Sequence, residues 1–206
     1  AWRKLRFTSR KTMVVAQQLY EGVSLGERGS TGLITYMRTD STNVASSAIS
    51  EVREYISSKF GQDYYPKSPK IYTKKVKGAQ EAHEAIRPTS IWDEPSSVKQ
   101  FLNRDQSRLY DLIWKRMLAS QMNDAVYDST TLEISASCVG SDKKYEFRAN
   151  GSVLKFPGYR KIYIEGSDDS SKQNSEEAIR AVHSVRYPPL GKRGVGLFLS
   201  LIHISE

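Results

Sequence analysis

The stretch that decides the fold is GLITYMRTDSTN, residues 32–43. A short apolar run, 33–37, is rich in strand formers and predicts a strand that leads into a polar loop of small residues. If the extended geometry persists beyond it, Tyr36 and Arg38 point to the same side. A phenol has a pKa of about 10 and is a weak nucleophile, but a guanidinium favours the phenolate and binds phosphate with two hydrogen bonds. The pair therefore suits attack on a phosphodiester. The competing interpretation is a plain strand carrying an exposed charge.

A second run, AQEAHEAIRPT, covers residues 79–89. We expect a short helix over 80–86 that Pro88 ends, with His83 and Arg87 on one face because they are four residues apart. His83 could donate to a phosphate or relay a proton, and Arg87 could bind a nucleic-acid backbone. The alternative is a surface helix with an internal ion pair. Three histidines in the chain argue against a zinc site, and no Gly-x-x-x-x-Gly-Lys loop occurs.

Outward from these runs, the pattern predicts helices first and strands afterwards. Helices are expected over 11–21, capped by Thr8 or Ser9, and over 45–60 and 105–122. Period-two alternation then predicts strands over 131–137, 143–149 and 159–164, and the apolar run 195–204 fits a buried strand or a helix end. Residues 61–79 and 166–178 look like irregular connections. The expected fold class is α+β.

The composition of the chain indicates which class of binding partner and which class of protein to expect. The chain has 206 residues, 31 lysines and arginines, 23 aspartates and glutamates, and a net charge of +8, which favours an anionic partner such as nucleic acid. No apolar run reaches the length of a membrane span, and the first residues do not form a secretory signal. The single cysteine, Cys138, excludes an internal disulfide. Because no methionine opens the chain, we expect it to begin inside a longer protein.

Together, the runs LITYMRTDSTN and AQEAHEAIRPT resemble the bacterial-type DNA topoisomerase I of the type IA topoisomerases. Met37 favours that branch over topoisomerase III, which typically has proline at this position. Two further stretches resemble the family, namely SRKTMVVAQQLYEGV (9–23), before the nucleophile, and RLYDLIWKRMLASQMNDAVYDSTTLEI (108–134), which leads into the arch-forming β domain. The resemblance covers roughly residues 3–165.

The resemblance implies three regions. They are a mainly helical domain with the catalytic tyrosine (1–122), part of a β-rich arch domain (123–187), and a tail (188–206) that departs from the family pattern. Its last residues, SLIHISE, resemble translated sequencing-adapter readthrough, so we expect a non-native tail.

The resemblance also implies a mechanism. Tyr36 matches the nucleophile that attacks one DNA strand, stays linked to the 5′ phosphate and leaves a free 3′ hydroxyl. Another stretch of DNA passes through the gap, the hydroxyl reverses the reaction, and negative supercoils relax without a nucleotide cofactor. Arg38 matches the arginine that positions the scissile phosphate, and His83 matches a histidine that supports DNA binding and cleavage. Ser41 and Arg87 are expected phosphate contacts.

The family also implies Mg²⁺, bound by an acidic domain whose Asp-x-Asp cluster does not occur in these 206 residues; Asp168 and Asp169 lie in a serine-rich loop and are no substitute. We therefore expect no metal ligands in this chain and no relaxation of DNA by the chain alone. It should still bind single-stranded DNA in a salt-sensitive way. The expected compartment is the bacterial cytoplasm, a plastid or a mitochondrion.

Two alternatives stay open. The chain could be a non-catalytic module that binds single-stranded DNA, or a truncated product without activity. Tyr64, Tyr65 and Tyr72 lie among lysines and could stack on bases, although a surface loop explains them equally.

Overall fold

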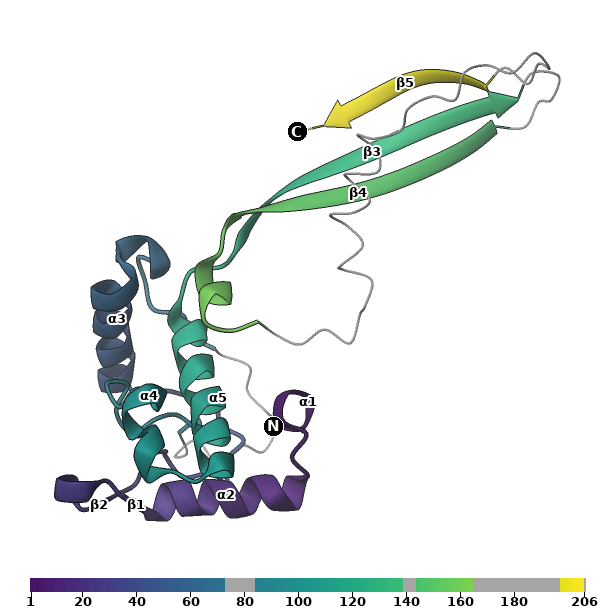
Figure 1. Cartoon of the computed structure of the whole chain (residues 1–206). Helices are drawn as coiled ribbons and strands as arrows, with labels where there is room; N and C mark the ends of the chain where they lie inside the picture. The colour runs from purple at the N-terminus through teal and green to yellow at the C-terminus, as the bar shows by residue number, and fades with distance from the viewer. Residues whose placement is uncertain (73–83, 139–143, 165–196, 206) are drawn as a thin grey trace. The chain divides into compact units, whose positions relative to one another are not determined.

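The computed structural model describes residues 1–72, 84–138, 144–164 and 197–205 (Figure 1). The chain divides into two compact units, Ala1–Asp124 with Pro157–Gly166, and Ala125–Phe156 with Ser167–Glu206. The helices belong to the first unit and the long strands to the second, so the fold class is α+β, as the sequence predicts. The domain limits 1–122, 123–187 and 188–206 remain predictions. No helix within the described ranges is long and apolar enough to cross a bilayer.

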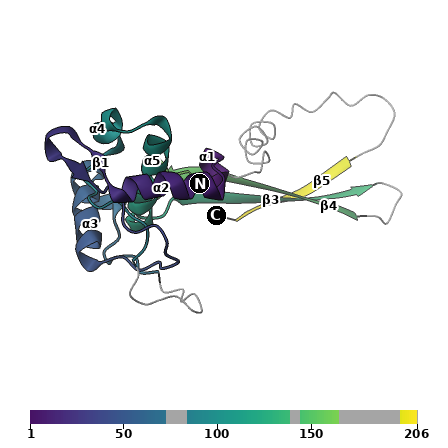
Figure 2. The same cartoon turned by 90° about the horizontal axis from the view of Figure 1, so that it is seen from below.

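The first unit is built mainly from three longer helices, α2, α3 and α5 (Figure 1 and Figure 2). Its elements in chain order are α1 (Trp2–Leu5), α2 (Ser9–Glu21), β1 (Val23–Ser24), η1 (Gly26–Arg28), β2 (Ser30–Thr31), α3 (Ser46–Phe60), η2 (Gln62–Tyr64), α4 (Pro95–Val98), η3 (Lys99–Phe101), α5 (Arg104–Gln121) and η4 (Gly158–Lys161).

Local capping sets the limits of the helices. Thr8 caps α2, its Oγ1 accepting the N–H of Lys11 at 3.2 Å, and Asn103 and Gln106 form a reciprocal capping box at the start of α5. Gly22 ends α2 with φ 122° and Gly61 ends α3 with φ 93°, in a region of backbone space that other residues avoid. The three longer helices predicted from the sequence, over 11–21, 45–60 and 105–122, are thus confirmed, each within a few residues.

The core lies where α5 packs against both α2 and α3. On α2 the buried side chains are Val15, Ala16 and Leu19, whereas Met13 and Tyr20 are exposed. On α3 the buried residues are Ala48, Val52, Tyr55 and Ile56, with Ile49 and Phe60 half-buried.

The described part of the connection after α3 is anchored to the end of α5. Buried Gln121 accepts the N–H of Lys70 at 3.3 Å and donates to its carbonyl at 3.1 Å, so both the oxygen and the nitrogen of the amide have a partner. An ion pair of 2.7 Å joins Lys70 to Asp124. Residues 73–79 of the predicted irregular connection and the predicted loop 166–178 lie outside the described residues.

Three sequence expectations about regular structure were wrong. Residues 33–37 do not form a strand: Ile34 makes one isolated antiparallel bridge, to Pro88, and Met37 and Arg38 lie in a bend. Residues 84–86 are not helical; the rest of the predicted helix 80–86 lies outside the described residues. In place of the strand expected over 159–164, the chain forms η4.

A glycine explains why the chain turns at η4. Gly158 has φ 48°, and a Cβ there would lie 2.4 Å from the carbonyl oxygens of both Asn123 and Asp124. The adjacent N–H of Tyr159 donates to the Asn123 carbonyl at 2.8 Å. This close approach ties η4 to the end of α5, so tertiary contacts override the strand-like pattern.

The second unit contains a three-stranded antiparallel sheet in the order β4-β3-β5. Its strands are β3 (Val126–Cys138), β4 (Lys144–Phe156) and β5 (Leu197–Ser205). β3 pairs with β4 from Val126↔Phe156 to Ser137↔Lys144, so both predicted strands are present and longer than expected. β5 pairs with β3, so the described part of the apolar run 195–204 forms a strand rather than a helix end.

Candidate active site

The segment 33–37 is held on both sides by backbone hydrogen bonds. The N–H of Leu33 donates to the carbonyl of Leu19 at the end of α2, at 2.8 Å, and the carbonyl of Leu33 accepts the N–H of Thr89 at 3.0 Å. Leu33, Ile34 and Met37 are buried, but Tyr36 between them is 44% exposed. The buried neighbours fix the backbone, and the phenol of Tyr36 reaches the surface.

Thr35 joins the two sequence runs at their backbones. Its N–H donates to the carbonyl of Arg87 at 2.9 Å, and its Oγ1 accepts the N–H of Arg87 at 3.0 Å. The same hydroxyl donates to the carbonyl of Ala85 at 2.9 Å. A further bond of 2.7 Å runs from the Thr89 hydroxyl to the carbonyl of Gly32. The residue before Tyr36 is thereby fixed to the second run.

Tyr36 and Arg38 present a phenol and a cation on one exposed stretch. The Tyr36 ring meets the ring of Tyr20 edge-on, with centroids 5.5 Å apart and an interplanar angle of 67°. Arg38 is exposed, and within the described ranges no hydrogen bond or ion pair holds its guanidinium. Within the described structure, Arg38 is thus available to an anionic ligand, and the phenol of Tyr36 reaches the surface nearby.

Ser41 lies in a loop that its own side chains stiffen. The N–H of Ser41 donates to Thr39 Oγ1 at 3.0 Å, and Ser41 Oγ accepts the N–H of Asn43 at 3.1 Å. Such i to i+2 bonds define a turn and leave the hydroxyl proton of Ser41 for another acceptor.

Arg87 is held by its own neighbours rather than facing solvent freely. Its Nε and Nη2 donate to the two carboxylate oxygens of Glu84, at 2.6 and 3.1 Å, and its Nη1 donates to the Pro88 carbonyl at 2.8 Å. Glu84 Oε1 also accepts the N–H of Ala45, just before α3. Burial alone would raise the pKa of Glu84, but the hydrogen bonds from Arg87 and Ala45 outweigh it and lower the pKa.

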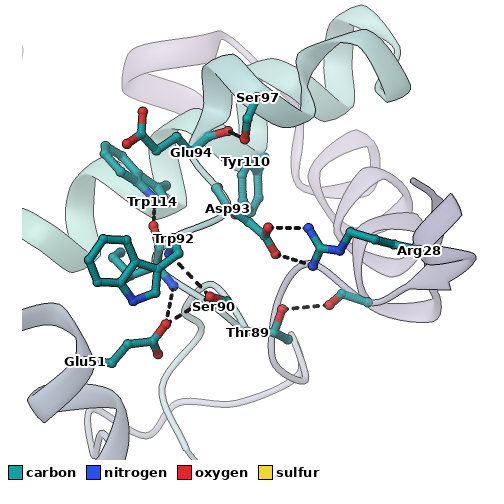
Figure 3. A network of polar contacts seen from close by, with 12 residues as sticks. Arg28, Glu51, Thr89, Ser90, Trp92, Asp93, Glu94, Ser97, Tyr110 and Trp114 are labelled. Atoms are coloured by element: carbon teal, nitrogen blue, oxygen red, sulfur yellow. Dashed lines mark hydrogen bonds and ion pairs between the residues drawn. The ribbon is translucent and has the colours of Figure 1, made fainter. Parts of the chain in front are cut away.

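A polar network anchors the chain just after the second run (Figure 3). Arg28 donates to both carboxylate oxygens of Asp93, at 2.5 and 3.0 Å. From α5, the hydroxyl of Tyr110 donates to the Asp93 carbonyl at 2.6 Å and Trp114 Nε1 donates to the Ile91 carbonyl at 2.8 Å. Burial raises the pKa of Tyr110, so it remains a neutral donor.

The same segment is tied to α3 by Glu51, whose Oε1 accepts the Ser90 hydroxyl at 2.9 Å and the Ile91 N–H at 3.0 Å (Figure 3). The network therefore fixes residues 90–94 to α3, α5 and η1. Because Thr89 and Arg87 hold segment 33–37, this scaffold indirectly holds Tyr36 as well.

The structure accordingly places Tyr36, Arg38, Ser41 and Arg87, whereas His83 lies outside the described residues. Hydrogen bonds between Thr35 and Arg87 join the backbone of Arg87 to the segment that carries Tyr36. The roles assigned to these residues from the sequence remain predictions.

Local reasoning missed Tyr20, Gly32 and Thr35 as residues that position the segment. Gly32 is the only one with a usable sequence signal, since it directly precedes the apolar run. The contact of Tyr20 with Tyr36 depends on how the β1–β2 hairpin returns the chain to α2.

The side chains of the described residues do not fit a metal. Among the described residues no group of three or more histidine, cysteine, aspartate or glutamate side chains could hold a metal ion. No step proposed below passes through one.

Comparison with known proteins identifies the family. The family model described as DNA topoisomerase matches residues 1–187. "DNA topoisomerase 1" of Xylella fastidiosa is 46% identical over 177 residues, covering 86% of this chain and 21% of that protein. "DNA topoisomerase 1" of Rickettsia felis is 47% identical over 176 residues, covering 85% of this chain and 22% of that protein.

A solved structure, full-length topoisomerase I from Thermotoga maritima, matches with a TM-score of 0.65 at 33% identity, covering 100% of this chain and 29% of that chain. The chain therefore belongs to the bacterial-type DNA topoisomerase I family of type IA topoisomerases. It spans about a fifth of the length of the curated relatives that it matches.

Proposed function

We propose that this chain supplies the nucleophile of a type IA DNA topoisomerase, and that the nucleophile is Tyr36. One observation carries the proposal. Tyr36 is the exposed side chain of a segment whose other apolar members are buried and whose backbone is fixed on both sides. A fixed backbone under an exposed phenol is what a nucleophile needs, because attack requires the reacting oxygen in one place.

The proposed step is a transesterification. The Tyr36 oxygen bonds to the phosphorus of one strand as the phenol loses its proton. The bond from phosphorus to the 3′ oxygen breaks, and that oxygen takes up a proton. The strand is then held through its 5′ phosphate. Attack by the 3′ hydroxyl reverses the reaction, so the cycle consumes no net proton, electron or nucleotide.

Arg38 is the proposed phosphate clamp. A guanidinium binds two phosphate oxygens at once and stabilises the charge that develops during attack. Its exposure, and the lack of any described partner, support this role. His83 and Ser41 are proposed as further contacts to the DNA. Arg87 is a weaker candidate, because Glu84 and Pro88 already take three of its N–H groups.

The whole protein is proposed to pass DNA through a single-strand break and relax negative supercoils. Its proposed partner is DNA, single-stranded at the cleavage site, without a nucleotide cofactor. The Mg²⁺ that the family implies would be bound by an acidic domain whose Asp-x-Asp cluster does not occur in these 206 residues, so we propose that this chain alone does not relax DNA. Relatives from bacteria favour the bacterial cytoplasm as the compartment.

The second candidate is a non-catalytic module that binds single-stranded DNA, which the net charge of +8 favours. Two of the tyrosines expected to stack on bases already pack against cations, Tyr65 below the Arg53 guanidinium at 4.6 Å and Tyr64 below Lys161 at 4.8 Å. Tyr72 is exposed, but its hydroxyl donates to the Ser120 carbonyl. These contacts weaken the stacking argument and leave charge as the main support.

The test is to trap the covalent adduct. The chain is mixed with the part of the Xylella fastidiosa relative that precedes the match, with magnesium and with a single-stranded oligonucleotide, and is then denatured. Attachment through the 5′ phosphate predicts a shifted protein band with a label at the 3′ end of the oligonucleotide and none with a label at the 5′ end.

Matched variants identify the residue. Tyr36→Phe should abolish the band. Tyr145→Phe on β4 is the matched control, because Tyr145 has a similar exposure of 47%, and it should keep the band. A band that survives Tyr36→Phe would overturn the proposed nucleophile. Salt-sensitive binding with no band in any variant would favour the binding module.

A further inference from the structure

We propose that Tyr20 is a positioning residue for Tyr36, a role that rests on the proposed function of Tyr36. The proposal starts from the end of α2, where three contacts converge on the segment that carries Tyr36. Leu19 accepts the backbone N–H of Leu33, the Tyr20 carbonyl lies against Gly32, and the Tyr20 ring meets the Tyr36 ring.

The first two contacts fix how closely the segment approaches the helix. A Cβ at Gly32 would lie 2.6 Å from the Tyr20 carbonyl oxygen, so glycine permits a backbone approach that no other residue allows without movement. The hydrogen bond from the N–H of Leu33 to the carbonyl oxygen of Leu19 has an N···O distance of 2.8 Å. Tyr20 thus belongs to the same turn of helix that sets the backbone position of residues 32–33.

The third contact acts on the Tyr36 side chain itself. An exposed tyrosine samples several χ1 wells, and a neighbour with a preferred geometry favours one of them. The two rings lie edge-to-face, with centroids 5.5 Å apart, which is the arrangement that the ring quadrupoles prefer. Tyr20 therefore restrains the direction in which the Tyr36 phenol points.

The exposure of the pair argues against a purely structural role for Tyr20. Tyr20 is 40% exposed and Tyr36 is 44% exposed, whereas the neighbouring core residue Leu19 is fully buried. A half-exposed ring adds little to the core, so changing it should affect Tyr36 more than the stability of the fold.

The variants for the test are Tyr20→Leu, which removes the ring, and Tyr20→Phe, which keeps the ring and removes only the hydroxyl. Val14→Leu is the control, because Val14 is an exposed apolar residue on the same helix. Two readouts are compared with the unfolding midpoint in urea. They are the rate of adduct formation in the mixture described above, and the ring signals of Tyr36 in a sample with 13C-labelled tyrosine, assigned by their loss in Tyr36→Phe.

Loss of the ring should slow adduct formation about fivefold, which corresponds to about 1 kcal/mol, the strength of an aromatic pair. Tyr20→Leu should also shift the Tyr36 ring signals. Tyr20→Phe and Val14→Leu should both leave the adduct rate and the Tyr36 ring signals as they are in the unaltered chain. Tyr36 signals that stay unchanged in Tyr20→Leu would overturn the positioning role.

The ring signals need no catalysis, so they separate the two proposals. Absence of an adduct from the unaltered chain counts against the proposed function, whereas the Tyr36 signals still decide whether Tyr20 orients that ring. An equal loss of adduct in Tyr20→Leu and Val14→Leu would mean a general effect on α2 and would also refute the positioning role.

Discussion

Gly32→Ala is the substitution that most directly disturbs the backbone beneath Tyr36. The new methyl group would lie 2.6 Å from the Tyr20 carbonyl oxygen, a backbone atom that cannot swing away. To reach an ordinary contact of 3.4 Å, the segment must move by about 0.8 Å. The same movement stretches the 2.8 Å bond between Leu33 and Leu19 beyond hydrogen-bonding distance.

The expected loss of stability combines two destabilising effects with one smaller stabilising effect. Overpacking costs about 1–3 kcal/mol and the lost hydrogen bond costs about 0.5–1.5 kcal/mol. Because the φ of Gly32 is outside the left-handed region, alanine also gains about 0.4–1 kcal/mol from a less flexible unfolded chain. The net prediction is a loss of about 1–3 kcal/mol in the free energy of unfolding.

Urea unfolding of the chain measures this loss, and adduct trapping measures its effect on the site. A displacement approaching 1 Å can cost a reaction about 100-fold, so we expect at least a tenfold slower adduct at temperatures where Gly32→Ala remains folded. Gly61→Ala is the control, because nothing lies within 4 Å of its Cβ position and its φ of 93° costs stability alone. Unchanged stability and adduct rate in Gly32→Ala would refute the reasoning.

Three further predictions concern the scaffold. Gly158→Ala should lose about 3 kcal/mol in urea unfolding, because its methyl would meet two carbonyl oxygens at 2.4 Å with φ at 48°; a wild-type midpoint would contradict the contact. Trp114→Phe leaves the Ile91 carbonyl without its donor and should lower the free energy of unfolding by about 1–3 kcal/mol in the same assay; an unchanged free energy of unfolding would contradict the role of this hydrogen bond. The lowered pKa of Glu84 stabilises the fold above the unfolded value of about 4.3, and this is lost as pH falls through the lower folded value. Glu84→Gln should therefore flatten the acid limb of stability below about pH 5; an unchanged limb would exclude the Arg87 pair as its cause.

The helices could be predicted from the sequence because their ends are local. The Thr8 cap, the Asn103 capping box and the glycines at 22 and 61 act within a few residues of the helices that they limit. A reader of the sequence therefore sees both the apolar periodicity and its boundaries. Strands β3 and β4 were predictable for the same reason, since they are adjacent in the chain and pair with each other.

The wrong expectations share a different cause. Segment 33–37 makes its bonds to α2 and to residues 87–89, and η4 follows from the close approach of Gly158 to the end of α5. These partners are distant in sequence, and no local propensity encodes them.

The site shows the same division between local and distant information. Tyr36 and Arg38 stand two residues apart in one run, so their chemistry is readable from the sequence. The Tyr20 ring and the engagement of Arg87 by Glu84 appear only once the chain has folded. The sequence therefore yields the candidate nucleophile but not the groups that orient it.

The central claim is that Tyr36 carries the 5′ phosphate, and mass spectrometry of the trapped adduct tests it most directly. Trypsin releases residues 29–38, GSTGLITYMR, a peptide with one tyrosine. The account predicts that this peptide, and no other, gains the mass of the oligonucleotide fragment. The same mass on a different peptide would contradict it.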